Sequence, residues 1–163
     1  MGGDDYRPKR GLISRMPAWL KACAVKAWFS GMVFYFIGWG LFIQSSDQLD
    51  ITLALGLALG VVTDVLINRA LIYFGTDKEN YRRFIFAYSK RFFSVPINLV
   101  YGIILSFAVA YVYHFINLAA QSVTGQPPET IFLGAEPILY GIFFMGLDML
   151  CVLIKHILFP TWD

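Results

Sequence analysis

Two aspartates lie inside apolar stretches of this 163-residue sequence, where a charged side chain is costly. Asp64 interrupts ALGLALGVVTDVLINRALIYFG (54–75), and Asp148 interrupts YGIFFMGLDMLCVLIKHILF (140–159). Carboxylates in such surroundings can bind a cation, relay protons or form a salt bridge to a basic group on a partner subunit. The alternative is structural, because burial favours the neutral form of a carboxyl group and a hydrogen-bonded Asp can hold helices together. The sequence leaves both interpretations open.

The stretches around these residues are long enough to cross a membrane. Hydrophobic residues make up 58% of the chain and charged residues 15%, whereas soluble domains contain about half apolar and about a quarter charged residues. The apolar residues form blocks near 27–43, 51–73, 92–118 and 137–159. About 20 residues at about 1.5 Å each cross the hydrocarbon core. We therefore predict an all-α integral membrane protein with four transmembrane helices.

The basic residues predict the orientation of these helices. All 13 Lys and Arg can be placed on one side of the membrane, whereas the segments 44–50 and 119–137 contain neither. Because basic residues favour cytoplasmic loops, we expect both termini on the cytoplasmic side of what we take to be a bacterial plasma membrane. The net charge of +2 then indicates topology and contact with membrane lipids, not nucleic-acid binding. The residues expected to contact anionic lipid are Arg69, Arg82, Arg83, Lys90 and Arg91.

The two halves of the chain have similar layouts. KAWFS (26–30) opens the first span and KRFFS (90–94) the third, while the second and fourth spans each carry one of the aspartates. Before the first span, the apolar residues of LISRMPAWLKACAVK (12–26) share one helical face, as in an interfacial helix. We therefore expect a single membrane domain (1–163) of two tandem parallel helical hairpins with short interfacial amphipathic segments. Its parts are a basic N-terminal segment (1–25), a first hairpin (26–74), a basic connection (75–91) and a second hairpin (92–159) with an outer loop near 119–137.

Small and polar residues recur at a spacing of four along the second and third spans and at a spacing of seven along the fourth. Such residues lie where transmembrane helices meet, because small side chains let backbones approach and polar groups need partners. The glycines expected at helix contacts are Gly56, Gly60, Gly102 and Gly141. Counting residues inward places Asn98 and Tyr35 near the depth of Asp64. The candidate intramembrane polar or ion site therefore comprises Asp64, Asp148, Asn68, Asn98 and Tyr35.

Sequence patterns of common catalytic and metal sites are absent from the chain. It contains no HExxH, GxSxG, CxxC or GKS/GKT motif, and its two histidines are predicted at opposite sides of the membrane. We therefore expect no enzymatic activity, no metal and no cofactor. His114 and Glu136 fall near the outer surface, where they could line an access path, although a single His at a helix end is usually only interfacial.

The leading functional hypothesis is an accessory or structural subunit of a membrane assembly. Four helices bury few side chains among themselves, so we expect a homo-oligomer or a complex with a larger membrane protein. The alternative is a small oligomeric transporter, coupled to ions or protons through Asp64 and Asp148.

The order of parts resembles that of the GtrA-like small membrane proteins. The residues that carry the resemblance are RRFIFAY from Arg82 and the ending LINRALIYF around Asn68, Arg69 and Phe74. The likeness covers most of the chain in layout, but the fourth span ends in LIKHILF without an Asn-Arg pair, and the two aspartates are outside the family's pattern. The resemblance implies a role in moving polyprenyl-phosphate-linked sugars across the membrane, with basic residues at the inner edge contacting lipid phosphate.

Overall fold

The computed structural model describes residues 11–44, 47–74, 81–87, 94–127 and 134–160, and every regular element within these ranges is a helix. The helices of the first half are α1 (Leu12–Arg15), α2 (Ala18–Val33), the π-helix η1 (Phe34–Gly38), α3 (Trp39–Gln44), α4 (Gln48–Val62), the π-helix η2 (Thr63–Ile67) and α5 (Asn68–Phe74). Those of the second half are the 3₁₀-helix η3 (Tyr81–Phe84), α6 (Ser94–Thr124) and α8 (Glu136–Leu158).

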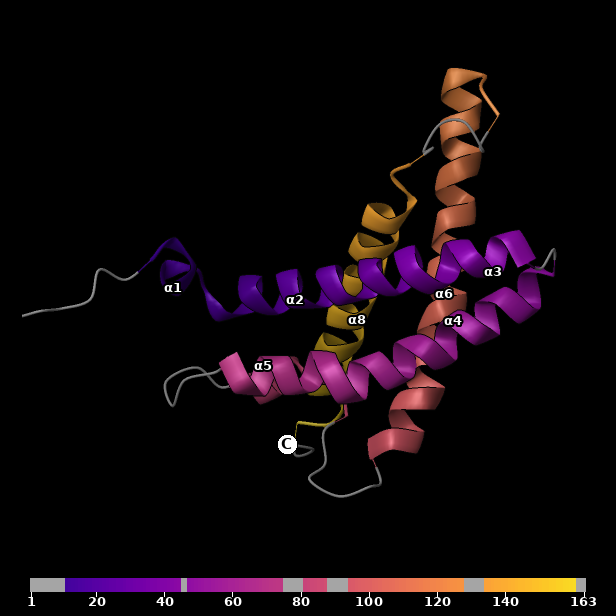
Figure 1. Cartoon of the computed structure of the whole chain (residues 1–163). Coiled ribbons are helices and arrows are strands. Elements are labelled where there is room, and N and C mark those ends of the chain that lie inside the picture. Colours follow the sequence, from indigo (N-terminus) through magenta and orange to yellow (C-terminus); the bar gives the residue numbers. More distant parts are fainter. Residues whose placement is uncertain (1–10, 45–46, 75–80, 88–93, 128–133, 161–163) are drawn as a thin grey trace, which may run out of the picture.

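These elements form four long helical stretches (Figure 1). The stretches Ala18–Leu41, Gln48–Tyr73, Ser94–Thr124 and Glu136–Leu158 are each long and apolar enough to cross a membrane. The first runs through η1 and the second through η2, so each of these two contains one turn of π-helix. The structure therefore confirms the prediction of an all-α protein with four helices able to span a membrane. The orientation and the location of the termini stay predictions.

The first span begins earlier than the sequence suggested. Helix α1 ends at Arg15, and Met16 is extended because the proline ring of Pro17 disfavours the helical conformation in the residue before it. Pro17 is the N-cap of α2, which begins at Ala18. Residues 12–26 are therefore not one interfacial helix, contrary to our expectation. Lys26 lies inside α2 rather than at the start of the span.

The main helix contacts join the first half of the chain to the second. Helix α4 packs mostly against α6 and helix α2 mostly against α8, while α2 and α4 share a smaller contact. In Figure 1 the first two spans run side by side, and α6 and α8 cross them. Each span of the first half thus has its principal partner in the second half. The relation of the two halves as parallel repeats stays a prediction.

Glycines bring α4 and α6 into close contact. A Cβ atom on Gly102 would lie 2.5 Å from Gly60 N and 2.6 Å from Gly56 O, and one on Gly56 would lie 2.6 Å from Ile103 Cα. Side chains at these positions would force the two backbones apart. Three of the glycines expected at helix contacts therefore lie in the α4–α6 contact.

The α2–α8 contact is built in the same way. A Cβ atom on Gly141 would collide with the carbonyl oxygen of Ala27, and one on Gly31 would lie 2.9 Å from Pro137 O. Gly141, the fourth glycine expected at a helix contact, thus faces α2, and the structure adds Gly31 on the opposite helix.

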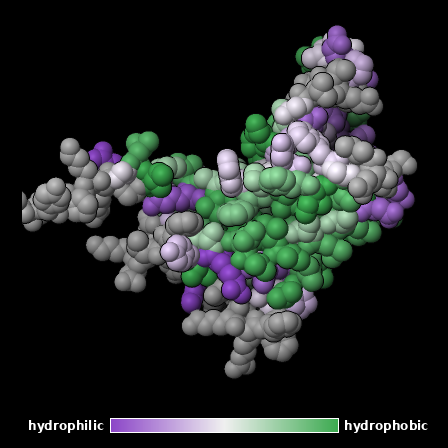
Figure 2. Space-filling view, viewed as in Figure 1, coloured by the Kyte–Doolittle hydropathy of each residue, from purple (hydrophilic) through white to green (hydrophobic). Residues whose placement is uncertain are grey.

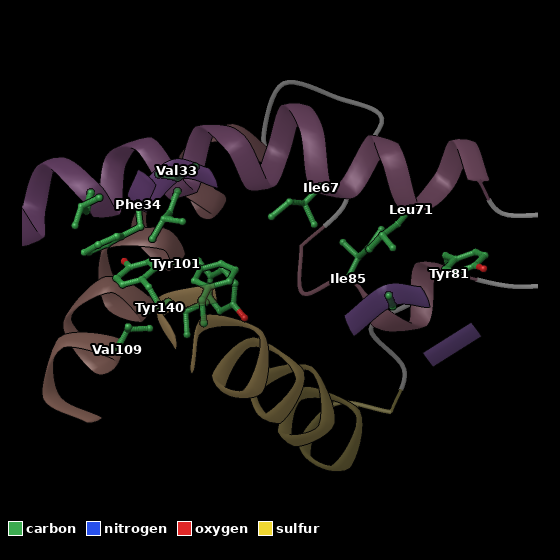
Figure 3. Close-up of a cluster of buried hydrophobic side chains, with 14 of the residues drawn as sticks. Val33, Phe34, Ile67, Leu71, Tyr81, Ile85, Tyr101, Val109 and Tyr140 are labelled. Atoms are coloured by element: carbon green, nitrogen blue, oxygen red, sulfur yellow. The ribbon is translucent and has the colours of Figure 1, made fainter. Parts of the chain in front are cut away.

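Buried aromatic and aliphatic side chains fill the space between the helices (Figure 3). The ring of Phe34 stacks on that of Tyr140 with centroids 4.8 Å apart, and Phe86 stacks on Tyr101 at 4.2 Å. A second group near η3 includes Ile67, Leu71, Tyr81 and Ile85. Outside the core, hydrophobic residues cover much of the face shown in Figure 2, as expected of a surface that contacts lipid.

Candidate functional site

Asp148 is held in a buried ion pair. Lys26 Nζ from α2 forms a salt bridge with Asp148 Oδ2, and the hydroxyl of Tyr101 from α6 donates a hydrogen bond to Asp148 Oδ1. The same Nζ donates to the carbonyl oxygen of Phe84 in η3 at 2.5 Å. Lys26 is 2% exposed and Asp148 3%. The pair therefore links α2, α6, α8 and η3 within the apolar core.

Local sequence spacing explains how the two charges meet. Gly141 and Asp148 are seven residues apart and so lie on one face of α8, the face that packs closely against α2. On α2, Ser30 lies one turn after Lys26, and its Oγ donates to the Lys26 carbonyl at 2.6 Å. The close approach of the backbones places the Lys26 side chain beside Asp148. An opposite charge and additional hydrogen bonds offset the cost of removing both ions from water.

Asp64 has a different set of neighbours. Asn98 Nδ2 from α6 donates to Asp64 Oδ1 at 2.8 Å and to the carbonyl oxygen of Ala87 at 3.1 Å. Asn68 Nδ2 also donates to Ala87 O, at 3.3 Å. Asp64 is half-buried and lies in the π-helix η2, while Asn98 is fully buried. These contacts tie the second span to α6 and to the backbone that follows η3.

The structure thus brings together most of the candidate polar residues, but in two clusters. Asp64, Asn98 and Asn68 form the first cluster, and Asp148 belongs to the second, with Lys26 and Tyr101. Tyr35 belongs to neither, because 49% of it is exposed and its ring packs against Phe36 and Trp39. The two carboxylates therefore do not converge on one site.

Sequence reasoning missed Lys26 and Tyr101. Lys26 was predicted at the start of the first span, where KAWFS (26–30) opens it, although the apolar residues of ACAV (22–25) before it indicate that it belongs within the helix. Tyr101 lies three residues after Asn98 and next to Gly102, so it borders the polar stripe on α6 but falls outside a spacing of four. Its burial is the feature that only the structure supplies.

Three of the basic residues expected to contact lipid are exposed. These are Arg69, Arg82 and Arg83, and the helices that carry them, α5 and η3, contact each other. The guanidinium group of Arg83 lies 4.7 Å from the centroid of the Phe84 ring. Lys90 and Arg91 lie outside the described residues. The three arginines therefore remain candidates for contact with anionic lipid.

A cavity of about 730 Å³ lies toward the opposite end of the molecule, between η1, α3, α4, α6 and α8. Its lining includes Phe34, Trp39, Tyr113, Tyr140, Asn117 and Glu136. Three buried atoms here have no hydrogen-bond partner: Asn117 Oδ1, Glu136 Oε2 and the Tyr140 hydroxyl. His114 also lines the cavity, so His114 and Glu136 belong to the same concave site. A cavity of this size falls in the range of small-molecule sites, about 300–1,000 Å³.

Among the described residues, no cluster of three or more His, Cys, Asp or Glu side chains could hold a metal ion. Comparisons with protein-family models, with curated proteins and with solved structures found no match to this chain. The resemblance to GtrA-like proteins therefore stays an expectation from the sequence.

Proposed function

We propose that this chain is a non-enzymatic membrane protein that serves as an accessory or structural subunit of a membrane assembly. The observation that carries the proposal is that each intramembrane carboxylate already has a polar partner within the chain. Asp148 is paired with Lys26 and accepts a hydrogen bond from Tyr101, and Asp64 accepts one from Asn98. An ion-coupled transporter needs a carboxylate that exchanges between ions and water, whereas a buried pair bound to several helices stabilises one arrangement.

The limited burial of the helices supports a role in an assembly. In an 18-residue stretch of each candidate span, between 28% and 39% of the residues are buried within the chain. Most residues there therefore keep some surface that can contact lipid or another protein. On α8, Ile142, Gly146 and Leu150 are exposed, and a Cβ atom on Gly146 would meet nothing within 4 Å. Small residues on exposed faces of transmembrane helices allow another helix to approach closely. Gly146 is therefore the position at which we would probe docking.

Pull-down from mild detergent with mass spectrometry tests this proposal. We expect the tagged chain to recover a second copy of itself or a larger membrane protein in a fixed ratio. Gly146→Leu should reduce that recovery without lowering the thermal stability of the chain, whereas Gly40→Leu provides a control at another position where a Cβ atom would meet nothing within 4 Å. Recovery of the wild type only as a monomer, in detergent and in nanodiscs, would contradict the proposal.

The second candidate function is a small transporter, and the cavity is the observation that favours it. Its volume and its unpaired polar atoms suit a small solute. Asp64→Asn separates the two proposals, because Asn keeps an oxygen that can accept from Asn98 but carries no charge. If the chain is a subunit, this variant assembles normally and retains function. Loss of solute flux in liposomes with unchanged assembly would instead support ion-coupled transport.

A further inference from the structure

We propose that the cavity binds a primary ammonium group carried on an apolar body. The three buried atoms without a partner all have lone pairs that can accept a hydrogen bond: the amide oxygen of Asn117, a carboxylate oxygen of Glu136 and the hydroxyl of Tyr140. A primary ammonium group has three N–H donors and no acceptor. It therefore offers as many donors as there are unpaired acceptors among the described residues of the cavity.

The charge around the cavity also favours a cation. Glu136 is in the first turn of α8, where the helix dipole stabilises a negative charge. The described residues of the lining include no Lys or Arg, and the sequence contains none in residues 27–68 or 92–154. Within these stretches only His114 could supply a positive charge to Glu136.

Aromatic rings form much of the remaining wall. Phe34, Trp39, Tyr113 and Tyr140 line the cavity, and a cation close to the face of such a ring is attracted by the ring electrons. Tyr140 is 6% exposed, so its ring and hydroxyl are held in place by packing, including the stack on Phe34 seen in Figure 3. Aliphatic side chains such as Leu55 and Val109 complete the lining and suit an apolar body.

The cavity can be reached from the surface. Gln48 and His114 both line it and are exposed. Gln48 lies within the segment 44–50 and His114 lies shortly before the segment 119–137, and both segments are predicted to be on the outer side of the membrane. An ammonium group could therefore come from the headgroup of phosphatidylethanolamine or from a free amine, since both present the same three N–H donors.

Calorimetric titration of the purified chain in dodecyl maltoside with 2-phenylethylamine tests the inference. We expect one molecule to bind, and we expect 2-phenylethanol and phenylacetate, which share the body but lack the cation, to bind at least about tenfold more weakly. Equal binding of the alcohol, or no binding of the amine to the wild type, would overturn the proposal and leave a cavity filled by solvent alone.

Substitutions assign the binding to the cavity. Glu136→Gln should weaken binding of 2-phenylethylamine about tenfold or more, whereas Asp50→Asn, at an exposed acidic residue outside the lining, should change it less than about twofold. Asn117→Leu provides a second test that leaves the charge intact, with an expected loss of about fivefold. Unchanged affinity in both Glu136→Gln and Asn117→Leu would refute the assignment, provided that the variants melt at the wild-type temperature.

Native mass spectrometry from nanodiscs distinguishes the two sources of the ammonium group. Retention of one phosphatidylethanolamine by the wild type, and its loss in Glu136→Gln, would identify the headgroup as the ligand. Binding of 2-phenylethylamine that is equally tight with and without phosphatidylethanolamine would identify a free amine. Either result supports the proposal, which does not depend on whether the chain is a subunit of a larger assembly.

Discussion

Lys26→Met tests whether the buried ion pair stabilises the fold. Methionine keeps an unbranched side chain of similar length inside α2 but removes the charge and the donors. Asp148 would then lose its salt bridge and keep the hydrogen bond from Tyr101, while the carbonyl oxygen of Phe84 would lose its donor. We therefore expect a large loss in the free energy of unfolding.

The size of this loss follows from the burial of both partners. Lys26 is 2% exposed and Asp148 3%. Water therefore cannot solvate the Asp148 carboxylate after the Lys26 ammonium group is removed. Removing one partner of a buried ion pair typically costs about 3–5 kcal/mol. A free energy of unfolding of about 5–15 kcal/mol is usual for a domain. The variant should therefore still fold, with a much lower free energy of unfolding than the wild type. Asp148→Asn should also be destabilising, because it leaves the Lys26 ammonium without its carboxylate.

A double-mutant cycle makes the measurement specific to the pair. In Lys26→Met/Asp148→Asn neither member of the buried pair carries a charge, and the amide oxygen introduced at position 148 can still accept from the Tyr101 hydroxyl. We expect the double variant to be about 2 kcal/mol more stable than the sum of the single effects predicts. Unfolding in mixed micelles, followed by circular dichroism, supplies the free energies. Arg69→Met, which removes an exposed cation from the second span, serves as the control and should stay within about 0.5 kcal/mol of the wild type.

Two results would refute this reasoning. If Lys26→Met costs less than about 1 kcal/mol, the ammonium group is not balancing a buried charge. If the losses in unfolding free energy of the two single variants add up to the loss of the double variant, Lys26 and Asp148 act independently. The salt bridge then does not hold α2 to α8.

Three further predictions concern packing, hydrogen bonding and topology. Gly102→Ala should destabilise the chain by about 1–3 kcal/mol because its Cβ would lie 2.5 Å from the α4 backbone, whereas Gly146→Ala, with open space around it, should be neutral or stabilise α8 by up to about 1 kcal/mol in the same unfolding assay. Asn98→Ala should cost about 1–3 kcal/mol, since a fully buried donor to Asp64 and Ala87 is lost; no change would mean that these contacts are absent. In a cysteine-free background of intact cells, a membrane-impermeant maleimide should label Asp50→Cys but not Arg82→Cys, and the reverse pattern would overturn the predicted orientation.

The features that the sequence predicted well depend on local pattern. Composition and the lengths of the apolar blocks indicated four helices able to cross a membrane, and the structure contains them. Spacing along a single helix indicated that Gly60 and Gly102 face a neighbouring helix, and counting residues placed Asn98 at the depth of Asp64. These arguments need only the rise and periodicity of one helix.

Other features depend on contacts between distant parts of the chain. Counting residues gives the depth of a side chain but not its direction around the helix. Tyr35 was therefore predicted at the depth of Asp64 and included in the candidate site, but its side chain faces outward. The pairing of Lys26 with Asp148 requires the first span to pack against the fourth, and no local pattern specifies that choice. The break between α1 and α2 follows from Pro17, because a proline disfavours the helical conformation in the residue before it, whereas the amphipathic pattern continues on both sides.

The ion pair and the cavity involve different residues, which leads to a last prediction. Lys26 and Asp148 contact Tyr101 and Phe84, and none of these four lines the cavity. A ligand that binds only the folded chain stabilises it by mass action. The stabilisation by 2-phenylethylamine should therefore be the same in the wild type and in Lys26→Met, within about 0.5 kcal/mol.

If 2-phenylethylamine stabilised the wild type and Lys26→Met by amounts that differ more than this, the ion pair and the cavity would be coupled. The physical route is then α8, because this helix carries both Asp148 in the ion pair and Glu136 in the cavity lining. A shift of α8 on α2 after the loss of Lys26 would move Glu136 relative to the aromatic walls and weaken binding. Independent effects would show instead that the close α2–α8 contact at Gly31 and Gly141 holds the helix in place without the salt bridge. Measuring the unfolding free energy of both proteins with and without the amine separates the two outcomes.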